Sequence, residues 1–151
     1  MTSLMVVPAV LFTTLVAGLF AAFSYAVMPA LRRVDDVVLV RTMQAINRAI
    51  LNPVFLTLFL GALVLDVVVT ARLWSVSGAG VWALAGTVAY AATVVVTIAR
   101  NVPLNDALDL DEGTPAEQRA AFEVSWTRWN HVRTATSVTA AACLLVALTR
   151  C

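Results

Sequence analysis

Four long apolar runs restrict what this sequence can fold into. The hydrocarbon core of a bilayer is about 30 Å thick, and a helix needs about 20 predominantly apolar residues to cross it. Runs of this order predict four membrane-spanning helices, at about 4–28, 53–70, 81–99 and 133–149. The fourth run is short, and we expect the helix that leads into it to supply the missing length. The expected fold is therefore all-α, a four-transmembrane-helix bundle in a single domain covering residues 1–151.

The composition agrees with this interpretation and excludes other classes. Hydrophobic residues make up 61% of the chain and charged residues 13%, whereas soluble domains average about half and about a quarter. A net charge of +1 and the absence of lysine argue against nucleic acid as a partner. The single histidine, His131, and the two cysteines, Cys143 and Cys151, have no spacing typical of metal ligands. We therefore expect the lipid bilayer as the main partner, with no metal and no other bound cofactor.

The arginines predict how the chain is oriented in the membrane. Short loops rich in Lys or Arg stay on the cytoplasmic side of the plasma membrane. The connections between spans one and two and between spans three and four contain every arginine except Arg72 and Arg150. We therefore expect both connections in the cytoplasm and both termini outside, which gathers most polar residues at one mouth of the bundle.

Both of these connections carry helix signals. In the first, Val34, Val38, Ile46 and Ile50 recur at helical spacing among polar residues, which predicts an amphipathic helix at the membrane surface. In the second, the sequence TPAE at 114–117 has the residues of a capping box, so a helix is expected to begin there and to extend into span four. Small residues on the spans permit close helix packing and also self-association into a homo-oligomer.

The stretch SWTRWNHVRT, residues 125–134, places several candidate site residues just before span four. At about 100° per residue, Trp126, Trp129, Asn130 and Arg133 share one helix face, and His131 points about 140° away from Trp126. A tryptophan belt at the membrane surface, with arginines beside it, is an equally good interpretation of the aromatic residues alone. Arg133 is harder to explain in this way, because a guanidinium at the start of a span needs water, a headgroup or an internal partner.

The end of span three offers further polar side chains. Pro103 lacks a backbone donor and disfavours helical geometry at the preceding residue, so we expect the helix to break there. Asn101 and Asn105 bracket the expected break. They are as well suited to ending the helix and forming a turn as to binding a ligand.

Three more amides lie at the same membrane level in the first connection, at Gln44, Asn47 and Asn52. Amide side chains from three segments are then expected to converge on Arg133. The result is a polar pocket with walls of apolar helices, which is typical of a small-molecule site.

The segments RTMQAINRAILNP, RNVPLN and WTRWNHVRT together resemble the anthrone oxygenase-like family of small four-span membrane proteins, and most closely its bacterial members. The matching residues are Gln44, Asn47, Pro53, Asn101, Pro103, Asn105, Trp126, Trp129, Asn130 and Arg133. The resemblance implies an oxygenase that oxidises an anthrone or another polycyclic phenol with dioxygen, without a bound metal or flavin. An apolar aromatic small molecule and dioxygen are then the expected ligands.

Within that resemblance, each candidate residue has a hypothetical role. The rings of Trp126 and Trp129, together with the amide of Gln44, bind the substrate. The oxygen atoms of the substrate accept hydrogen bonds from Arg133, Asn47, Asn101, Asn105 and Asn130. His131 accepts the proton, or a water molecule held by the asparagines takes its place.

A different class of function stays open. The chain is then a non-catalytic membrane protein that binds a lipid headgroup or a partner through its polar mouth, with the arginines meeting anionic lipid. A carrier is disfavoured, because Asp66 is the only acidic residue within a predicted span and no proton relay across the bilayer is visible.

Overall fold

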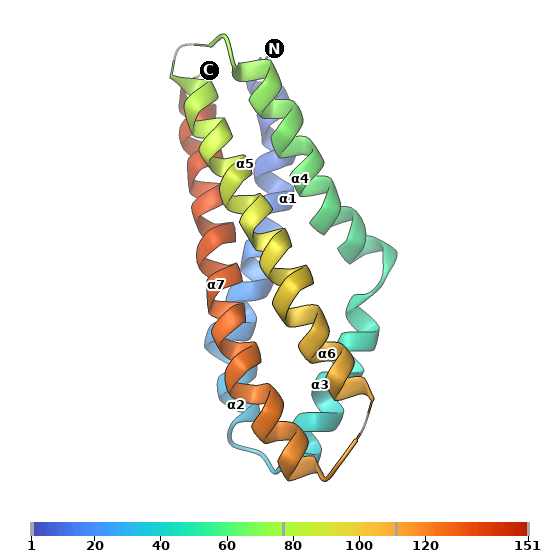
Figure 1. Cartoon of the computed structure of the whole chain (residues 1–151). Helices are drawn as coiled ribbons and strands as arrows, with labels where there is room; N and C mark the ends of the chain where they lie inside the picture. The colour runs from blue at the N-terminus through green and yellow to red at the C-terminus, as the bar shows by residue number, and fades with distance from the viewer. Residues whose placement is uncertain (1, 77, 111, 151) are drawn as a thin grey trace.

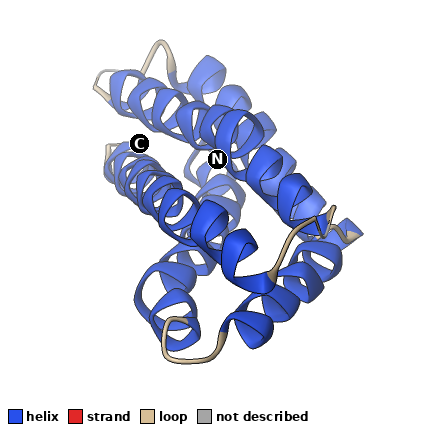
Figure 2. Cartoon of the chain, turned by 60° about the horizontal axis from the view of Figure 1, so that its bottom comes forward, coloured by secondary structure: helices blue, strands red, loops and turns tan. Residues whose placement is uncertain are grey.

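The computed structural model describes residues 2–76, 78–110 and 112–150, and this part of the chain is helical with no strand. The long helices are α1 (Thr2–Ala22), α3 (Asp36–Ile50), α4 (Pro53–Leu73), α5 (Ala79–Val96) and α7 (Pro115–Thr149). The short elements are the π-helical turns η1 (Phe23–Val27) and η2 (Thr97–Asn101) and the helices α2 (Met28–Leu31) and α6 (Val102–Asp109). Figure 2 shows how little of the chain lies in loops.

Four helical segments are long and apolar enough to cross a membrane: Leu4–Leu31, Pro53–Leu73, Ala79–Asp109 and Pro115–Thr149. They confirm the all-α fold with four spans. Each of the first, third and fourth segments continues beyond the apolar run that predicted it. The helical extension into the fourth span and the separate helix α3 between the first two spans are both present as expected.

The four spans form a ring in which α1 packs against α4 and α7, and α5 packs against the same two helices. Both termini and the turn after α4 lie at one end, which we call the terminal end (Figure 1). Helix α3 and the loop residues 112–114 lie at the other, which we call the connection end. Gly86 shows how closely α5 approaches α7, because a Cβ there would lie 3.2 Å from the carbonyl oxygen of Ala140.

Side-chain caps explain where the helices begin. The carboxylate of Asp35 accepts a hydrogen bond from the Val38 amide before α3, and Asn52 accepts one from Phe55 before α4. Helix α7 begins with the predicted capping box between Thr114 and Glu117, in which each side chain accepts from the other residue's amide.

The predicted break at Pro103 is wrong. The third span continues from α5 through η2 into α6, with Val102 in helical geometry at φ −60° and ψ −52°. The wider π-helical turn ends just before Pro103, so this residue stands in the first turn of α6, where a missing N–H costs little. The first span is built in the same way, with η1 followed by Pro29 in α2.

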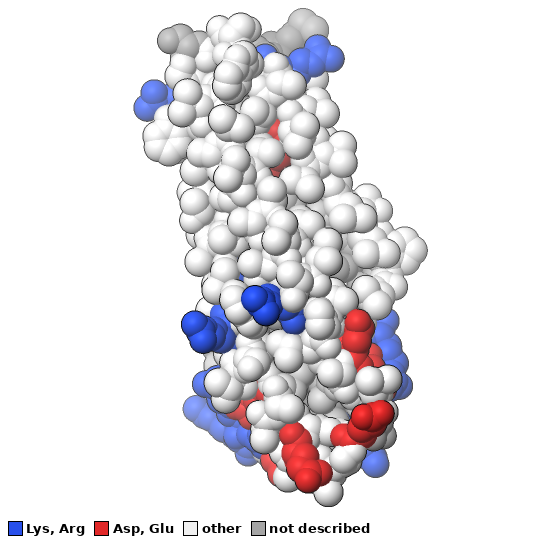
Figure 3. Space-filling view, in the orientation of Figure 1, with Lys and Arg blue, Asp and Glu red and all other residues white. Residues whose placement is uncertain are grey.

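Charged side chains gather at the connection end, and the shaft of the bundle shows almost none (Figure 3). Arg119 on α7 pairs with Asp36 at 3.0 Å and with Glu123 at 2.6 Å, and Glu123 also pairs with Arg32 at 3.0 Å. These ion pairs fasten the extension of α7 to the turn between α2 and α3. Cys143 is buried as a free thiol, and Cys151 lies outside the described residues.

Candidate functional site

Arg133 is buried in the bundle near the connection end, with 6% of its surface exposed. One nitrogen, Nη2, donates to Asn130 Oδ1 at 2.7 Å, and Nε has no hydrogen-bond partner. No carboxylate forms an ion pair with it in the described ranges of the chain. A buried cation without an acidic partner is costly, so its surroundings must offset that cost or a ligand must do so.

Aromatic rings supply part of that compensation. The guanidinium carbon of Arg133 lies 4.2 Å from the ring centre of Phe20 and 5.2 Å from that of Trp126. Each such contact contributes about 2 kcal/mol when it is shielded from water. The rings also stiffen the site, because Phe20 packs edge-on against Phe59 and Trp126 stacks on Phe122.

Asn130, also on α7, holds Arg133 in place and is itself anchored to the first span. Its Nδ2 donates to the carbonyl of Phe20 at 3.0 Å and to Ser24 Oγ at 2.8 Å, while its Oδ1 accepts from Arg133. Ser24 also bonds Thr134 at 3.0 Å. This network joins the π-helical turn η1 to α7 and fixes the direction of the guanidinium.

Trp126 is held from the opposite side by the third span. Its indole Nε1 donates to Asn105 Oδ1 at 2.7 Å, and its backbone carbonyl accepts from Asn101 Nδ2 at 3.4 Å. Asn101 is fully buried, and its Oδ1 has no partner. The two asparagines therefore orient Trp126, and through it one wall around Arg133.

A pocket of about 90 Å³ adjoins Arg133 and receives side chains from all four spans and from α3. Its polar lining consists of Asn47, Thr97, Asn105 and Arg133, and the remaining lining side chains are apolar or aromatic. The Nδ2 of Asn47 is buried and has no partner, like Nε of Arg133. Two unsatisfied donors beside one apolar pocket favour a flat ligand that carries an oxygen acceptor.

The structure thus brings together six predicted site residues. Arg133, Asn47, Asn105 and Trp126 line the pocket, and Asn101 and Asn130 position them.

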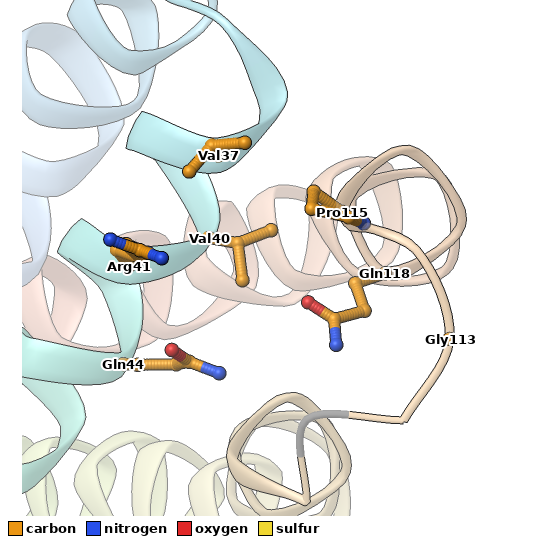
Figure 4. Close-up of a pocket in the computed structure, with 7 residues that line it drawn as sticks. All are labelled: Val37, Val40, Arg41, Gln44, Gly113, Pro115 and Gln118. Atoms are coloured by element: carbon orange, nitrogen blue, oxygen red, sulfur yellow. The ribbon is translucent and has the colours of Figure 1, made fainter.

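Three other predicted site residues lie elsewhere. Gln44 borders a separate pocket at the connection end, opposite Gln118 (Figure 4), and its amide donates to the carbonyl of Leu108 at 2.8 Å. Trp129 is half-buried beneath the guanidinium of Arg100, 5.0 Å from ring centre to Cζ. His131 is exposed, as its helical angle suggested. The expectation that Gln44 and Trp129 lie beside Arg133 is therefore corrected, since both side chains face other neighbours.

Sequence reasoning missed the contribution of the first span, namely Phe20, Phe23 and Ser24. An aromatic side chain in a continuous apolar run gives no sign that it faces an arginine. Pro29 was the available signal, because a proline near the end of a span commonly accompanies local 3₁₀ or π adjustment of the helix.

Metal ligands are not grouped in the described residues, where no cluster of three or more His, Cys, Asp or Glu side chains could hold an ion.

The family model described as anthrone oxygenase matches residues 41–143, more than half of the chain. The chain belongs to the anthrone oxygenase family. Comparisons with curated proteins and with solved structures find no match. The segment shared with the anthrone oxygenase family contains Asn47, Asn105, Trp126 and Arg133, whereas Phe20 precedes it.

Proposed function

We propose that this member of the anthrone oxygenase family is a membrane oxygenase that oxidises an anthrone-like polycyclic phenol with dioxygen in the pocket beside Arg133. The observation that carries the proposal is the buried guanidinium, which has no acidic partner within the described parts of the chain and lies against Phe20 and Trp126. An unpaired cation favours a ligand with negative charge, and aromatic walls favour a planar one.

The dimensions of the pocket define how such a substrate binds. Its space of about 90 Å³ is smaller than the roughly 150 Å³ of an engineered cavity that binds benzene. Only the oxygen-bearing edge of a polycyclic molecule enters beside Arg133. The other rings extend toward Leu51, which lines the pocket and is 70% exposed, and contact Phe55.

The chemistry requires a stabilised substrate anion. The substrate loses a proton from its benzylic CH₂ group, and the resulting anion passes an electron to dioxygen. The carbon radical and superoxide combine to form a C–O bond, and the peroxide takes up a proton. Loss of the second C–H proton with cleavage of the O–O bond leaves a carbonyl and releases water, so each oxygen atom of dioxygen is accounted for.

In this mechanism the protein stabilises charge on the substrate oxygen. Arg133 and Asn47 donate to the oxyanion, and each well-placed donor lowers the barrier by about 3 kcal/mol. Arg133 is the only ionisable side chain among the residues that line the pocket. A water molecule bound by Asn47 accordingly accepts the proton in place of the exposed His131.

The decisive measurement is dioxygen uptake by the purified protein with an anthrone as substrate. Replacing Arg133→Gln removes the charge, and kcat/KM is expected to fall by about 100- to 1000-fold. The matched control is Arg72→Gln, an exposed arginine in the last turn of α4 at the terminal end, which should retain the activity. Equal rates in the wild type and the Arg133 variant would contradict the proposal.

The competing function, a non-catalytic protein that binds a lipid headgroup at Arg133, gives a different pattern. In that case no preparation consumes dioxygen, and lipid that co-purifies with the wild type is missing from the Arg133→Gln variant.

We also propose that the protein lies in the plasma membrane with its connection end in the cytoplasm and both termini outside. The excess of arginine at that end supports this orientation. Reporter fusions at the C-terminus and in the 112–114 loop test it, and the loop fusion is expected to report the cytoplasm.

A further inference from the structure

Two further arginines, Arg100 and Arg128, lie outside the Arg133 pocket. Each stands on a helix where a membrane span joins the charged connection end. Arg100 stands in η2 at the end of the third apolar run, and Arg128 stands on α7 shortly before the fourth. Both guanidinium groups lie against Trp129, with Cζ at 5.0 Å from its ring centre for Arg100 and 6.0 Å for Arg128. Figure 3 shows basic side chains at the level where the apolar shaft ends.

Neither arginine has an acidic partner. The ion pairs in the described parts of the chain involve Arg32 and Arg119 with Asp36 and Glu123, and none includes Arg100 or Arg128. Both side chains are exposed. Their positive charge is therefore available to an external anion.

Arg100 borders a depression rather than a flat surface, and Arg128 reaches it only through the ring of Trp129, against which its guanidinium lies. The depression measures about 310 Å³ and is lined by Arg100, Pro103, Leu104, Ser125, Trp129 and the small side chain of Ala99. Toward the shaft, Val95 and Ile98 precede Arg100 on the same span and are 63% and 61% exposed. The third span thus carries exposed apolar side chains next to Arg100 in the chain.

We infer that this depression binds the phosphate headgroup of an anionic phospholipid. Guanidinium groups match phosphate oxygens with paired hydrogen bonds, and Ser125 adds a hydroxyl donor to the lining. Trp129 lies at the headgroup level, because indole rings favour that level of a bilayer. The acyl chains lie along the apolar shaft of the bundle, which gives a lipid an advantage over free phosphate.

This lipid site is independent of the proposed oxygenase activity. None of its lining residues borders the pocket beside Arg133. A lipid bound there anchors the π-helical turn η2, whose Asn101 bonds the backbone of Trp126 on the inner side. Failure of the lipid site would therefore leave the proposed chemistry untouched.

The test measures thermal unfolding of the detergent-solubilised protein during titration with phosphatidylglycerol, phosphatidylcholine or inorganic phosphate. Ligands that bind the folded state raise the midpoint, and at a given concentration a tighter ligand raises it further, with the logarithm of the ratio of ligand concentration to Kd. Phosphatidylglycerol is expected to raise the midpoint of the wild type, and the other two are expected to have little effect. In Arg100→Gln/Arg128→Gln, affinity for phosphatidylglycerol should fall about 30-fold, or about fivefold for each arginine.

The matched control is Arg33→Gln/Arg48→Gln, which removes the same charge from exposed positions in the turn after α2 and on α3. This control should keep the phosphatidylglycerol effect. An equal loss in both double variants would show diffuse attraction to the basic end and would overturn the site. Equal stabilisation of the wild type by all three ligands would overturn it as well, even if a double variant failed to fold.

Discussion

The two halves of the bundle each bury an ionisable side chain, and they treat it differently. Asp66 on α4, toward the terminal end, is fully buried, and both of its oxygens accept from the hydroxyl of Thr13, at 3.3 and 3.4 Å. Arg133, toward the connection end, keeps an unpartnered nitrogen and lines a pocket. A buried polar group with a protein partner specifies packing, whereas one with spare donors beside open space is suited to a ligand.

The backbone shows the same contrast. Both π-helical turns, η1 and η2, lie in the half that contains Arg133, and their residues Phe23 and Thr97 line the pocket. Helix α4, which carries Asp66, is regular from Pro53 to Leu73. Single π-turns are frequent at functional sites, because they turn side chains away from the faces that a regular helix would give them.

The largest expected difference between the halves concerns ligand binding. A hydroxylated anthraquinone has the planar shape and acidic oxygen of the proposed product and can be titrated by quenching of tryptophan fluorescence. Arg133→Gln should weaken its binding about 100-fold, since truncating a buried charged partner costs several kcal/mol. Asp66→Asn should leave the affinity unchanged. A similar loss in both variants would show that the two buried groups do not differ in function.

Removing the partner of Asp66 should affect stability and not activity. Thr13→Val leaves the buried carboxyl group without its hydroxyl donor, which costs about 1–3 kcal/mol of unfolding free energy. Unfolding by denaturant in mixed micelles measures the loss, and dioxygen uptake should match the wild type. If the Thr13→Val variant consumed dioxygen more slowly under conditions where it is fully folded, Asp66 would belong to the catalytic machinery. The two buried ionisable groups would then not differ in function.

The wall around Arg133 offers a smaller and more selective change. In Asn105→Leu the indole N–H of Trp126 loses its acceptor, which costs about 1–2 kcal/mol and loosens the ring. We expect KM for the anthrone to rise about tenfold with a smaller change in kcat, because the substrate oxygen still meets Arg133. A selective loss of kcat would instead assign Asn105 to proton transfer.

The smallest effect is expected at the start of α7, remote from both buried groups. Hydrogen bonds from Thr114 hold the pKa of Glu117 below its ordinary value. The stabilisation by Glu117 is therefore present above its unfolded pKa and is lost as the pH falls through the lower, folded pKa. In Thr114→Ala the melting midpoint should drop slightly near neutral pH, and the difference from the wild type should shrink in acid. A pH-independent difference would contradict this account of the capping box.

Much of the fold could be predicted because it depends on patterns within single segments. Apolar runs of sufficient length predicted the four spans, and TPAE predicted the start of α7. The break expected at Pro103 failed because proline forbids one hydrogen-bonding pattern but does not say what replaces it. Here a π-helical turn absorbs the proline and the helix continues.

The candidate site was only partly predictable. Arg133 and Asn130 could be placed on one face of a helix, and so could Trp126, because helical periodicity fixes their relative directions. The same reasoning placed Trp129 beside them. In the structure, however, the Trp129 ring lies against Arg100 of the third span. Which neighbour a side chain meets depends on how helices pack, and one helix does not contain that information.

The sequence by itself determined that this chain forms four membrane spans with its charges at one end, because burial of apolar residues in lipid depends on local composition and length. It also determined which residue types could bind an oxyanion. Only the tertiary structure decided that Phe20 from the first span and Trp126 from the fourth face the same guanidinium, and that no carboxylate of the described residues forms an ion pair with it. The reason is that a pocket is a relation between helices, set by their packing and by two π-helical turns.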